Sequence, residues 1–277
     1  MNKQSPHIKI LILNWNGEKI INECLSSLQN INYNNYSIDV IDNGSSDDSI
    51  NVITNNYNKV NIHKINRNVG YSRGYNIIFK KLKDENFDYY LLLNNDVYVN
   101  KNILKELNDA VSEFGENNIY GSKINYSSDE SKIWYAGGYL NKFLGLAHHI
   151  GINKYEDNIK YKTNKTDYVS GCCMLIKKEL INKLDGFNAR FKMYYEDVDL
   201  CYRAGKLGLH CFFIENALAY HKVSYSIGNN SLKKIFSKTI SKYKFIYYHN
   251  NLILFIISLF INLMMIPFSF ILYLIKK

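Results

Sequence analysis

The feature that most constrains the fold is a short apolar run followed by a helical pattern, repeated along the first hundred residues. The apolar runs cover residues 8–13, 37–41, 60–65 and 89–93. After the first run, apolar residues recur at helical spacing, at Ile20, Ile21, Cys24, Leu25 and Leu28. Strands alternating with helices predict an α/β chain with a parallel, doubly wound sheet. A chain of 277 residues, 47% of them hydrophobic, is large enough to bury such a core.

A polar segment follows each of the four apolar runs. These segments are residues 14–17, 42–47, 66–76 and 94–96. The carboxyl ends of parallel strands meet at one edge of a sheet, and open α/β sheets bind their ligands there. The sequence therefore predicts one polar site to which all four segments contribute.

The residue types in these segments suggest how a phosphorylated ligand would be held. Asp42 can accept hydrogen bonds from a base or a ribose, although an Asx turn before the next helix explains it as well. For Asp47 we favour the turn. Arg67 can pair with a base carbonyl or a phosphate. Asp96 can hold a divalent cation that bridges two phosphates, the alternative being a simple turn before the next helix.

A second polar cluster lies in residues 187–204, where aromatic side chains precede three carboxylates and a helical pattern begins. Glu196 and Asp197 fall at or near the predicted helix N-terminus. The helix dipole favours ionised carboxylates, whereas aromatic neighbours desolvate them and raise their pKa, so the direction of the net pKa shift stays open. A carboxylate in this setting suits a general base that deprotonates an alcohol. An acidic helix cap beside a core stripe is the alternative.

The segments between these clusters are less regular. After Gly121 the pattern changes to short strands and loops, which we assign to the acceptor side, with a mobile loop at 153–166. His221 ends a predicted strand and is followed by polar residues. It is a candidate metal-side group, and a purely structural histidine is the alternative.

Charge and cysteine content narrow the class of protein. The formal net charge is +9, from 34 Lys+Arg against 25 Asp+Glu, which suits nucleotides, phospholipid head groups or nucleic acid. A nucleic-acid partner is disfavoured because the lysines are spread out and no aromatic residues are interleaved with a basic stripe. The five cysteines show no CxxC spacing, and we interpret them as reduced core residues of a cytosolic domain.

Taken together, the motifs resemble those of family 2 glycosyltransferases, and within that family the rhamnosyltransferase-like branch. The matching segments run in the family's order from about residue 7 to 225: residues 13–17, 42–47, 66–70, 92–97, 169–171, 186–204 and 220–221. The resemblance implies a GT-A fold, with a Rossmann-like, mostly parallel sheet flanked by helices. It also implies a nucleotide-diphospho-sugar donor, a divalent cation (Mg²⁺ or Mn²⁺) and inversion at the anomeric carbon.

The same resemblance assigns roles by position. Asp197 would be the catalytic base, with Glu196 beside it, and Asp96 and His221 would bind the metal. The implied nucleotide-sugar-binding residues are Asn14, Asn16, Asp42, Arg67, Gly70, Asn76, Asn95 and Asp96. One departure affects the metal: the family's Asp-x-Asp is Asn94-Asn95-Asp96 here, with a single carboxylate. Mg²⁺ keeps several waters, so one carboxylate with diphosphate oxygens can still hold it.

The C-terminal segment has a different composition. Residues 245–275 contain no Asp, Glu, Lys or Arg, and lysines precede and follow them. A helix over residues 252–275 would be about 36 Å long against a hydrocarbon core of about 30 Å. It could therefore span a membrane or lie in the interface as a C-terminal hydrophobic helix. The positive-inside bias places the catalytic part on the cytoplasmic face of the cell membrane.

These inferences give an expected organisation and function. We expect a glycosyltransferase domain over residues 1–228, with a nucleotide-binding half at about 1–122 and an acceptor half at about 123–228, followed by a membrane-associated segment at 229–277. The expected activity is sugar transfer to a hydroxyl acceptor in the synthesis of cell-surface polysaccharide or lipid-linked glycan. The alternatives are a weak or inactive nucleotide-sugar-binding module and a nucleotidyltransferase.

Overall fold

The structure, a computed structural model, describes residues 5–157, 160–223 and 231–275, without the side chains of 231–233 and 265–275. Its N-terminal half alternates strands and helices. These are β1 (Ile8–Asn14), α1 (Ile21–Leu28), β2 (Tyr36–Asp42), α2 (Ser49–Asn56), β3 (Val60–Lys64), α3 (Tyr71–Lys81) and β4 (Tyr89–Asn94). All four strands are parallel, in the order β4-β1-β2-β3. The predicted alternation is confirmed in this half, and each strand ends within a residue of its predicted end or polar segment.

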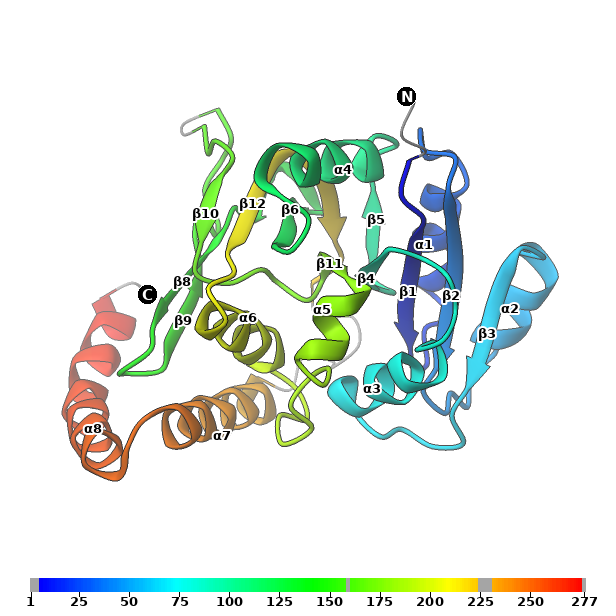
Figure 1. Cartoon of the computed structure of the whole chain (residues 1–277). Helices are drawn as coiled ribbons and strands as arrows, with labels where there is room; N and C mark the ends of the chain where they lie inside the picture. The colour runs from blue at the N-terminus through cyan, green and yellow to red at the C-terminus, as the bar shows by residue number, and fades with distance from the viewer. Residues whose placement is uncertain (1–4, 158–159, 224–230, 276–277) are drawn as a thin grey trace.

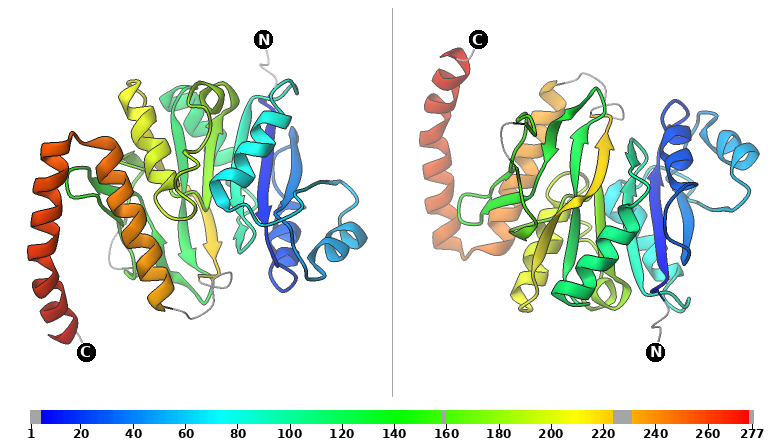
Figure 2. Two further views of the ribbon diagram at one scale, coloured as in Figure 1. Left: turned by 90° about the horizontal axis from the view of Figure 1, so that it is seen from below. Right: turned by 90° about the horizontal axis from the view of Figure 1, so that it is seen from above.

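The second half extends the same sheet. Its elements are β5 (Val97–Val99), α4 (Ile103–Phe114), β6 (Ile119–Tyr126), β7 (Asp129–Tyr135), β8 (Gly138–Asn141), β9 (Leu146–His149), β10 (Asn164–Thr166), β11 (Cys173–Lys177), α5 (Lys178–Lys183), α6 (Glu196–Lys206) and β12 (Cys211–His221). Ten of the described strands form one sheet with the order β10-β12-β6-β11-β4-β1-β2-β3, with β5 beside β12 and β7 beside β6, and β8 pairs with β9 in a separate two-stranded sheet. Helices cover both faces of this sheet (Figures 1 and 2). Because β6 crosses the expected boundary near residue 122, the two halves share one sheet.

The expectation of a mostly parallel sheet is wrong for the second half. The strand β11 lies in the middle of the sheet and runs antiparallel to both of its neighbours, β4 and β6. It begins where β4 ends, with Cys173 opposite Leu93, and so runs back along that strand. The sequence shows β11 only as a continuous apolar run, which carries no information about direction. The sheet of this α/β fold is therefore mixed, with parallel and antiparallel strand pairs.

An aromatic cluster attaches the approach to α6 to the nucleotide-binding half. Phe187 packs against three rings of α3, with centroid distances of 5.7 Å to Tyr71, 5.8 Å to Tyr75 and 6.1 Å to Phe79. Phe187 and Tyr75 are fully or almost fully buried. Large buried aromatic side chains of this kind dominate core energetics. The carboxylates that follow Phe187 are therefore held at a fixed position relative to α3.

Two further helices complete the chain, α7 (Ser231–His249) and α8 (Leu252–Ile275). They lie along one end of the molecule, with α7 beside α6 and α8 beside the β8–β9 hairpin (Figure 1). Phe245 and Ile246 of α7 are fully buried, and His249 Nε2 lies 2.7 Å from Asp199 Oδ1 of α6. Within the part of the chain that the structure describes, no helix combines the length and the apolarity needed to cross a membrane.

Candidate active site

Two asparagines join the carboxyl ends of β1 and β4. Asn95 Nδ2 donates a hydrogen bond of 2.9 Å to Asn14 Oδ1, and Asn14 Nδ2 donates one of 3.0 Å to Ser49 Oγ at the start of α2. Both asparagine side chains are buried. A Cβ added to Gly17 would lie 2.1 Å from Asn14 Oδ1, so only glycine fits there. Asn14 and Asn95, two predicted sugar-nucleotide ligands, thus hold the loops of the site together.

The loops after β2 and β3 are in direct contact. Asp42 is buried and its Oδ1 accepts a hydrogen bond from Ser45 N at 3.0 Å, which is the Asx turn considered for this residue. Asn43, which the sequence did not single out, accepts from Val69 N at 3.0 Å and so holds the loop that carries Arg67. Arg67 itself is exposed at the rim. Asp42 and Arg67 therefore lie on adjoining loops.

The side chains of Asn16 and Asp47 accept hydrogen bonds from backbone N–H groups of the same loops. Asn16 adopts a positive φ of 51° and its Oδ1 accepts from Ser46 N at 2.8 Å. Asp47 accepts from Ser49 N and Oγ and from Glu18 N. The turn that we favoured for Asp47 is confirmed.

Gly70 and Asn76 connect α3 to the segment before α6. Gly70 precedes α3 with a φ of 87°, a conformation that favours glycine, and the next residue, Tyr71, donates from its backbone N to Lys192 O at 3.3 Å. Asn76 uses both ends of its amide on the backbone of Phe187, at 2.7 Å and 2.9 Å. Both polar atoms of the Asn76 amide are therefore used in a structural contact, although this residue was expected to bind the nucleotide sugar.

Asp96 and His221 are neighbours because β5 pairs with β12. Val97 lies opposite His221 in that ladder, and His221 Nε2 is 3.3 Å from Asp96 Oδ1. Both residues are buried. Within the described residues, Asp96 Oδ1 and His221 Nδ1 have no hydrogen-bond partner. Buried polar atoms without a partner are costly, so these two atoms fit a ligand or an ion bound beside them.

This pair suits a divalent cation only in part. A carboxylate oxygen and an imidazole nitrogen can both bind a transition-metal ion such as Mn²⁺. Mg²⁺ is usually bound by carboxylates, with water molecules as its other ligands. In the described ranges no cluster of three or more His, Cys, Asp or Glu residues could enclose a metal. Asp96 and His221 would therefore share such an ion with oxygens of a bound diphosphate and with water.

Glu196 and Asp197 form the first turn of α6. The two residues before them, Tyr194 and Tyr195, both have positive φ values, of 67° and 69°. Non-glycine residues in this region are strained, and such strain clusters at functional sites. The sharp turn aims Asp197 at the loop before β11, where Gly171 N donates to Asp197 Oδ2 at 3.0 Å. The predicted helix start at Glu196 is confirmed.

The two carboxyl groups differ in their surroundings. Burial raises the pKa of Glu196 well above its ordinary value, and the neighbouring Asp197 raises it further. Within the described part of the chain, Glu196 Oε2 has no hydrogen-bond partner. Burial also raises the pKa of Asp197, but backbone N–H groups of Gly171 and Val198 oppose that rise. The pKa of both carboxyl groups is therefore raised, which answers the direction that the sequence left open, and backbone N–H groups limit the rise at Asp197.

Cys172 lies between the metal-side carboxylate and the α6 carboxylate. Burial raises the pKa of its thiol, and the nearby charges of Asp96 and Asp197 raise it further. Asn94 Nδ2 donates to Cys172 Sγ at 3.3 Å, which fixes the end of β4 against this residue. Both carboxylates thus border the Gly171–Cys172 segment. All five cysteines are buried free thiols.

Two aromatic residues that the sequence did not identify, Trp134 and His149, also lie at this site. Trp134 of β7 packs edge-on against His221 and His149, with ring centroids 4.5 Å and 4.3 Å apart. Burial lowers the pKa of His149 to about 4, so its imidazole is neutral at physiological pH. Trp134 lies more than 80 residues from His221 in the sequence, and no local pattern connects them. Only the pairing of β6 with both β7 and β12 brings them together.

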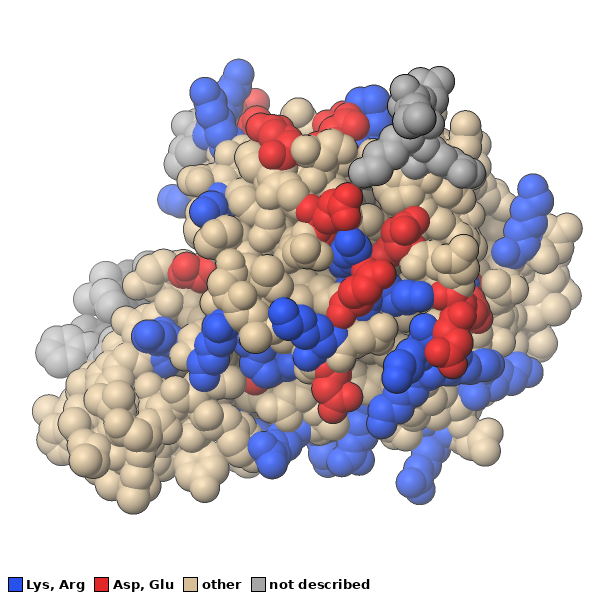
Figure 3. Space-filling model, viewed as in Figure 1, with Lys and Arg blue, Asp and Glu red and all other residues tan. Residues whose placement is uncertain are grey.

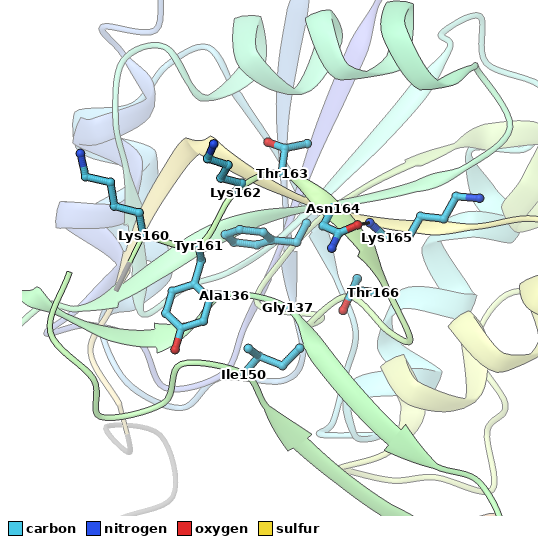
Figure 4. A pocket seen from close by; sticks show the side chains of 11 residues that line it. Ala136, Gly137, Ile150, Lys160, Tyr161, Lys162, Thr163, Asn164, Lys165 and Thr166 are labelled. Carbon is cyan, nitrogen blue, oxygen red and sulfur yellow. Dashed lines mark hydrogen bonds between the residues drawn. The ribbon is translucent and has the colours of Figure 1, made fainter. Parts of the chain in front are cut away.

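A cavity of about 320 Å³ lies elsewhere, beside the edge strand β10 (Figure 4). Lys160, Tyr161, Lys162 and Thr166 are among the residues that line it. In Figure 4 the side chains of Lys160, Lys162 and Lys165 extend in different directions and do not converge on one point. The candidate catalytic and metal-side residues are not among its lining residues, so the cavity is separate from the site described above.

Comparison with known proteins identifies the family. Residues 9–185 match the family model described as Glycosyl transferase family 2. The chain belongs to this family. The match includes Asp42, Arg67 and Asp96, whereas Asp197 and His221 lie beyond it. The family resemblance inferred from the motifs is thus confirmed.

Two relatives of this family 2 chain are named as sugar transferases. It is 27% identical over 208 residues to the low-salt glycan biosynthesis hexosyltransferase Agl10 of Haloferax volcanii, covering 71% of this chain and 61% of that protein. It is 22% identical over 229 residues to an N-acetylglucosaminyl-diphospho-decaprenol L-rhamnosyltransferase of Mycobacterium tuberculosis, covering 76% of this chain and 74% of that protein. The chain therefore spans about three fifths and three quarters of their lengths.

Solved structures show the same fold. The crystal structure of GalNAc-T7 with UDP, GalNAc and Mn²⁺ superposes on 79% of this chain and 44% of that one, with a TM-score of 0.65 and 15% sequence identity. At that identity the likeness establishes the fold alone. The central sheet flanked by helices is a GT-A-like fold, as the resemblance implied.

Proposed function

We propose that this chain is an inverting glycosyltransferase that moves a sugar from a nucleotide-diphospho-sugar to a hydroxyl group of a glycan or lipid-linked acceptor. The observation that carries the proposal is the pair of a buried Glu196 and a half-buried Asp197, at the end of a strained turn and beside the loop that also borders Asp96. Membership of the family and the glycan-building activities named for its relatives support the reaction class.

The chemistry of the pair suits a single displacement. Asp197 removes the proton from the acceptor hydroxyl as the acceptor oxygen attacks the anomeric carbon, and the bond from the sugar to the diphosphate breaks on the opposite side. The backbone N–H of Gly171 orients the Asp197 carboxylate for this step. Burial and the neighbouring Asp197 raise the pKa of Glu196, so Glu196 is the member of the pair that holds a proton more readily.

The donor would lie along the carboxyl ends of β1, β2 and β4. Asp42 and Arg67, on adjoining loops, are placed for the base and ribose, and Asp96 with His221 for the diphosphate end. A divalent cation bound at Asp96 and His221 would neutralise the departing diphosphate. Asp96 Oδ1 and His221 Nε2, which lie 3.3 Å apart, would supply two protein ligands for it.

Two other functions were considered from the sequence. Neither a non-catalytic nucleotide-sugar-binding module nor a nucleotidyltransferase is favoured by the relatives, which are named as transferases of sugars. The reactions differ in their products, because a sugar transferase releases nucleoside diphosphate and a nucleotidyltransferase releases pyrophosphate.

A screen of nucleotide sugars with the purified chain tests this proposal. We expect one donor to yield nucleoside diphosphate at a rate that rises at least about tenfold when a competent acceptor extract is added, with no pyrophosphate. Release should be unchanged by an exposed substitution away from the site, such as Ile77→Ala. Pyrophosphate as the product, or binding of a donor without turnover under any acceptor, would contradict the proposal.

The helices α7 and α8 support attachment of the chain to a membrane surface. Along the first half of α8 the polar residues face the protein: Ser258 and Asn262 are buried, and Asn262 Nδ2 donates to Leu144 O at 3.3 Å. The apolar residues face outward, with Ile253 70% exposed and Phe260 66% exposed. In Figure 3 the surface over the described first half of α8 shows no charged side chains, unlike much of the rest of this face.

An outward apolar face of this kind is typical of a helix that lies in the membrane interface. The exposed apolar residues of α7 and α8 are Ile235, Phe236, Ile240, Tyr247, Tyr248, Leu252, Ile253, Leu254, Ile256, Ile257, Phe260, Leu263 and Met264. Lysines of α7 border them, and these would meet anionic head groups. We therefore include association with the cytoplasmic face of the cell membrane in the proposal, with α8 lying on the surface.

Vesicle sedimentation tests the attachment. The double substitution Ile253→Glu and Phe260→Glu should reduce binding to vesicles with anionic lipid by about tenfold or more, because each charge opposes burial of the face in the interface. The matched control is Ile77→Glu, which places the same charge on an exposed apolar residue of α3 and should bind as the wild type does. Equal binding of the double variant and the control would contradict a role for this face.

A further inference from the structure

The first turn of α3 contacts both of the segments that place Asp197. Ser72 Oγ donates a hydrogen bond of 2.6 Å to Phe191 O in the segment before α6, and both residues are buried. Tyr71, the preceding residue, contacts the loop before β11, where its hydroxyl donates to Gly171 O at 2.9 Å. One end of α3 is therefore bonded to both chain segments that meet at the candidate base.

Gly171 joins Tyr71 to Asp197 through its two backbone polar groups. Its carbonyl oxygen accepts from the Tyr71 hydroxyl, and its N–H donates to Asp197 Oδ2 at 3.0 Å. A Cβ added to Gly171 would lie 2.8 Å from the Tyr71 hydroxyl and 3.5 Å from Asp197 Cβ, so the three residues are in close contact. The direction of the N–H that holds the Asp197 carboxylate therefore depends on the hydrogen bond from Tyr71.

The half-buried Tyr71 side chain is itself held in place by packing. Its ring centroid lies 4.8 Å from that of Tyr75 and 5.7 Å from that of Phe187, within the aromatic cluster between α3 and the approach to α6. Burial raises the pKa of the Tyr71 hydroxyl well above its ordinary value, so the hydroxyl keeps its proton and stays a hydrogen-bond donor. Tyr71 is thus a fixed donor to Gly171 O.

We propose that Tyr71 is a positioning residue for sugar transfer, which fixes Gly171 so that its backbone N–H holds the Asp197 carboxylate in place for removal of the acceptor proton. The inference rests on the role of Asp197 given above and adds a residue to which the sequence assigned no role. Tyr71 acts through Gly171 and not by touching the substrate. A hydrogen bond donated to a carboxylate fixes its oxygens and favours its ionised form.

The pH dependence of the reaction reports this hydrogen bond, because the other charges around Asp197 stay the same when the Tyr71 hydroxyl is removed. The titratable groups near Asp197 are Glu196 and Cys201 on α6, Tyr195 before that helix, Tyr135 on β7, Tyr168 and Cys172 beside Gly171, and the exposed Lys238 on α7. Burial raises the pKa of these tyrosines and cysteines, so they are neutral at physiological pH.

The kinetics of Tyr71→Phe test the proposal. The variant keeps the ring and its packing, and it removes only the hydroxyl that fixes Gly171. We expect kcat to fall about tenfold, because the base is less well oriented, while the donor Kd from titration calorimetry stays within about twofold. The acidic limb of kcat/KM should move to higher pH by about half a unit or more, because a weaker hydrogen bond from Gly171 N stabilises the ionised Asp197 less.

Tyr36→Phe is the matched control. Tyr36 is also half-buried, and its hydroxyl donates to Leu28 O at 2.9 Å. It begins β2, at the opposite end of that strand from Asp42. The control should lose about as much thermal stability as Tyr71→Phe does, with kcat, donor Kd and the acidic limb unchanged.

A second variant changes the same contact from its other side. In Gly171→Ala the added Cβ displaces the Tyr71 hydroxyl, so we expect the same fall in kcat, the same displaced limb and an unchanged donor Kd. Thermal unfolding checks that each variant is folded. Gly171→Ala decides the question if Tyr71→Phe does not fold.

The outcomes separate this inference from the proposed function. An unchanged kcat in Tyr71→Phe, or a fall in kcat without a displaced limb, overturns the role of Tyr71 while Asp197→Asn still loses turnover. A loss of donor affinity as large as the loss of rate would make Tyr71 a donor-binding residue and would also overturn it, as would the same kinetic change in Tyr36→Phe. If Asp197→Asn retains its turnover, the assignment of the base is wrong, and the role of Tyr71 fails with it.

Discussion

Replacing Asp197 with Asn is expected to lower kcat for sugar transfer by about 10²–10⁴-fold, the usual contribution of a general base. Asparagine keeps the shape of the side chain and still accepts the hydrogen bond from Gly171 N, so the turn before α6 should remain intact. Donor affinity should change little, because Asp96, Asp42 and Arg67 lie on other loops. Nucleoside diphosphate release and donor titration calorimetry measure the two quantities separately.

The neighbouring carboxyl provides the comparison for this variant. Because burial and the neighbouring Asp197 raise the pKa of Glu196 well above its ordinary value, Glu196→Gln imitates the protonated side chain and should lower kcat much less than Asp197→Asn does. The wild-type acidic limb should lie above the range of an ordinary aspartate, since burial raises the pKa of Asp197, and activity falls as the pH drops through that pKa. Turnover of Asp197→Asn within tenfold of the wild type would remove Asp197 from the role of base.

Removing divalent cations is expected to reduce turnover by at least about 100-fold, with recovery on addition of Mg²⁺ or Mn²⁺. The reason is the pair Asp96–His221, whose buried Oδ1 and Nδ1 atoms lack partners among the described residues. With a single carboxylate the site should bind the ion weakly in the absence of donor, so chelation and dialysis should strip it readily. Initial rates in excess chelator and after metal titration give the measurement.

A substitution at the site makes the metal experiment specific. Asp96→Asn should raise the metal concentration needed for half-maximal rate by about tenfold or more, because it removes the charged ligand. Unfolding temperature in chelator should match that in metal, which excludes loss of the fold as the cause. Full activity in excess chelator would refute the metal assignment.

The N-terminal half shows which structural features the local sequence pattern can predict. The period of the apolar residues identifies β1 to β4 and their helices, and the polar segments fall at the strand ends where the structure has them. The motif around Glu196 also predicts the start of α6 correctly. These features depend on residues close together in the sequence, so the types and spacing of those residues predict them directly.

The local sequence pattern did not predict contacts between segments that are far apart in the chain. The family resemblance implied that Asn76 binds the nucleotide sugar, but its amide is used by the backbone of Phe187. Trp134 and His149 gave no signal, and the apolar run of β11 gave no direction. The hydrogen bond from Ser241 of α7 to Met193 O, before α6, likewise joins segments that no local pattern connects.

The sequence alone determined the strand ends that carry the polar side chains, because residue type at short spacing encodes them, and its resemblance to the family implied the reaction class and the candidate base. The tertiary structure decided the mixed direction of the sheet, the protonation preference of Glu196 against Asp197, and the outward apolar face of α8. Those properties arise from burial and from the Coulombic fields of groups far apart in the chain, and neither exists until the chain has folded.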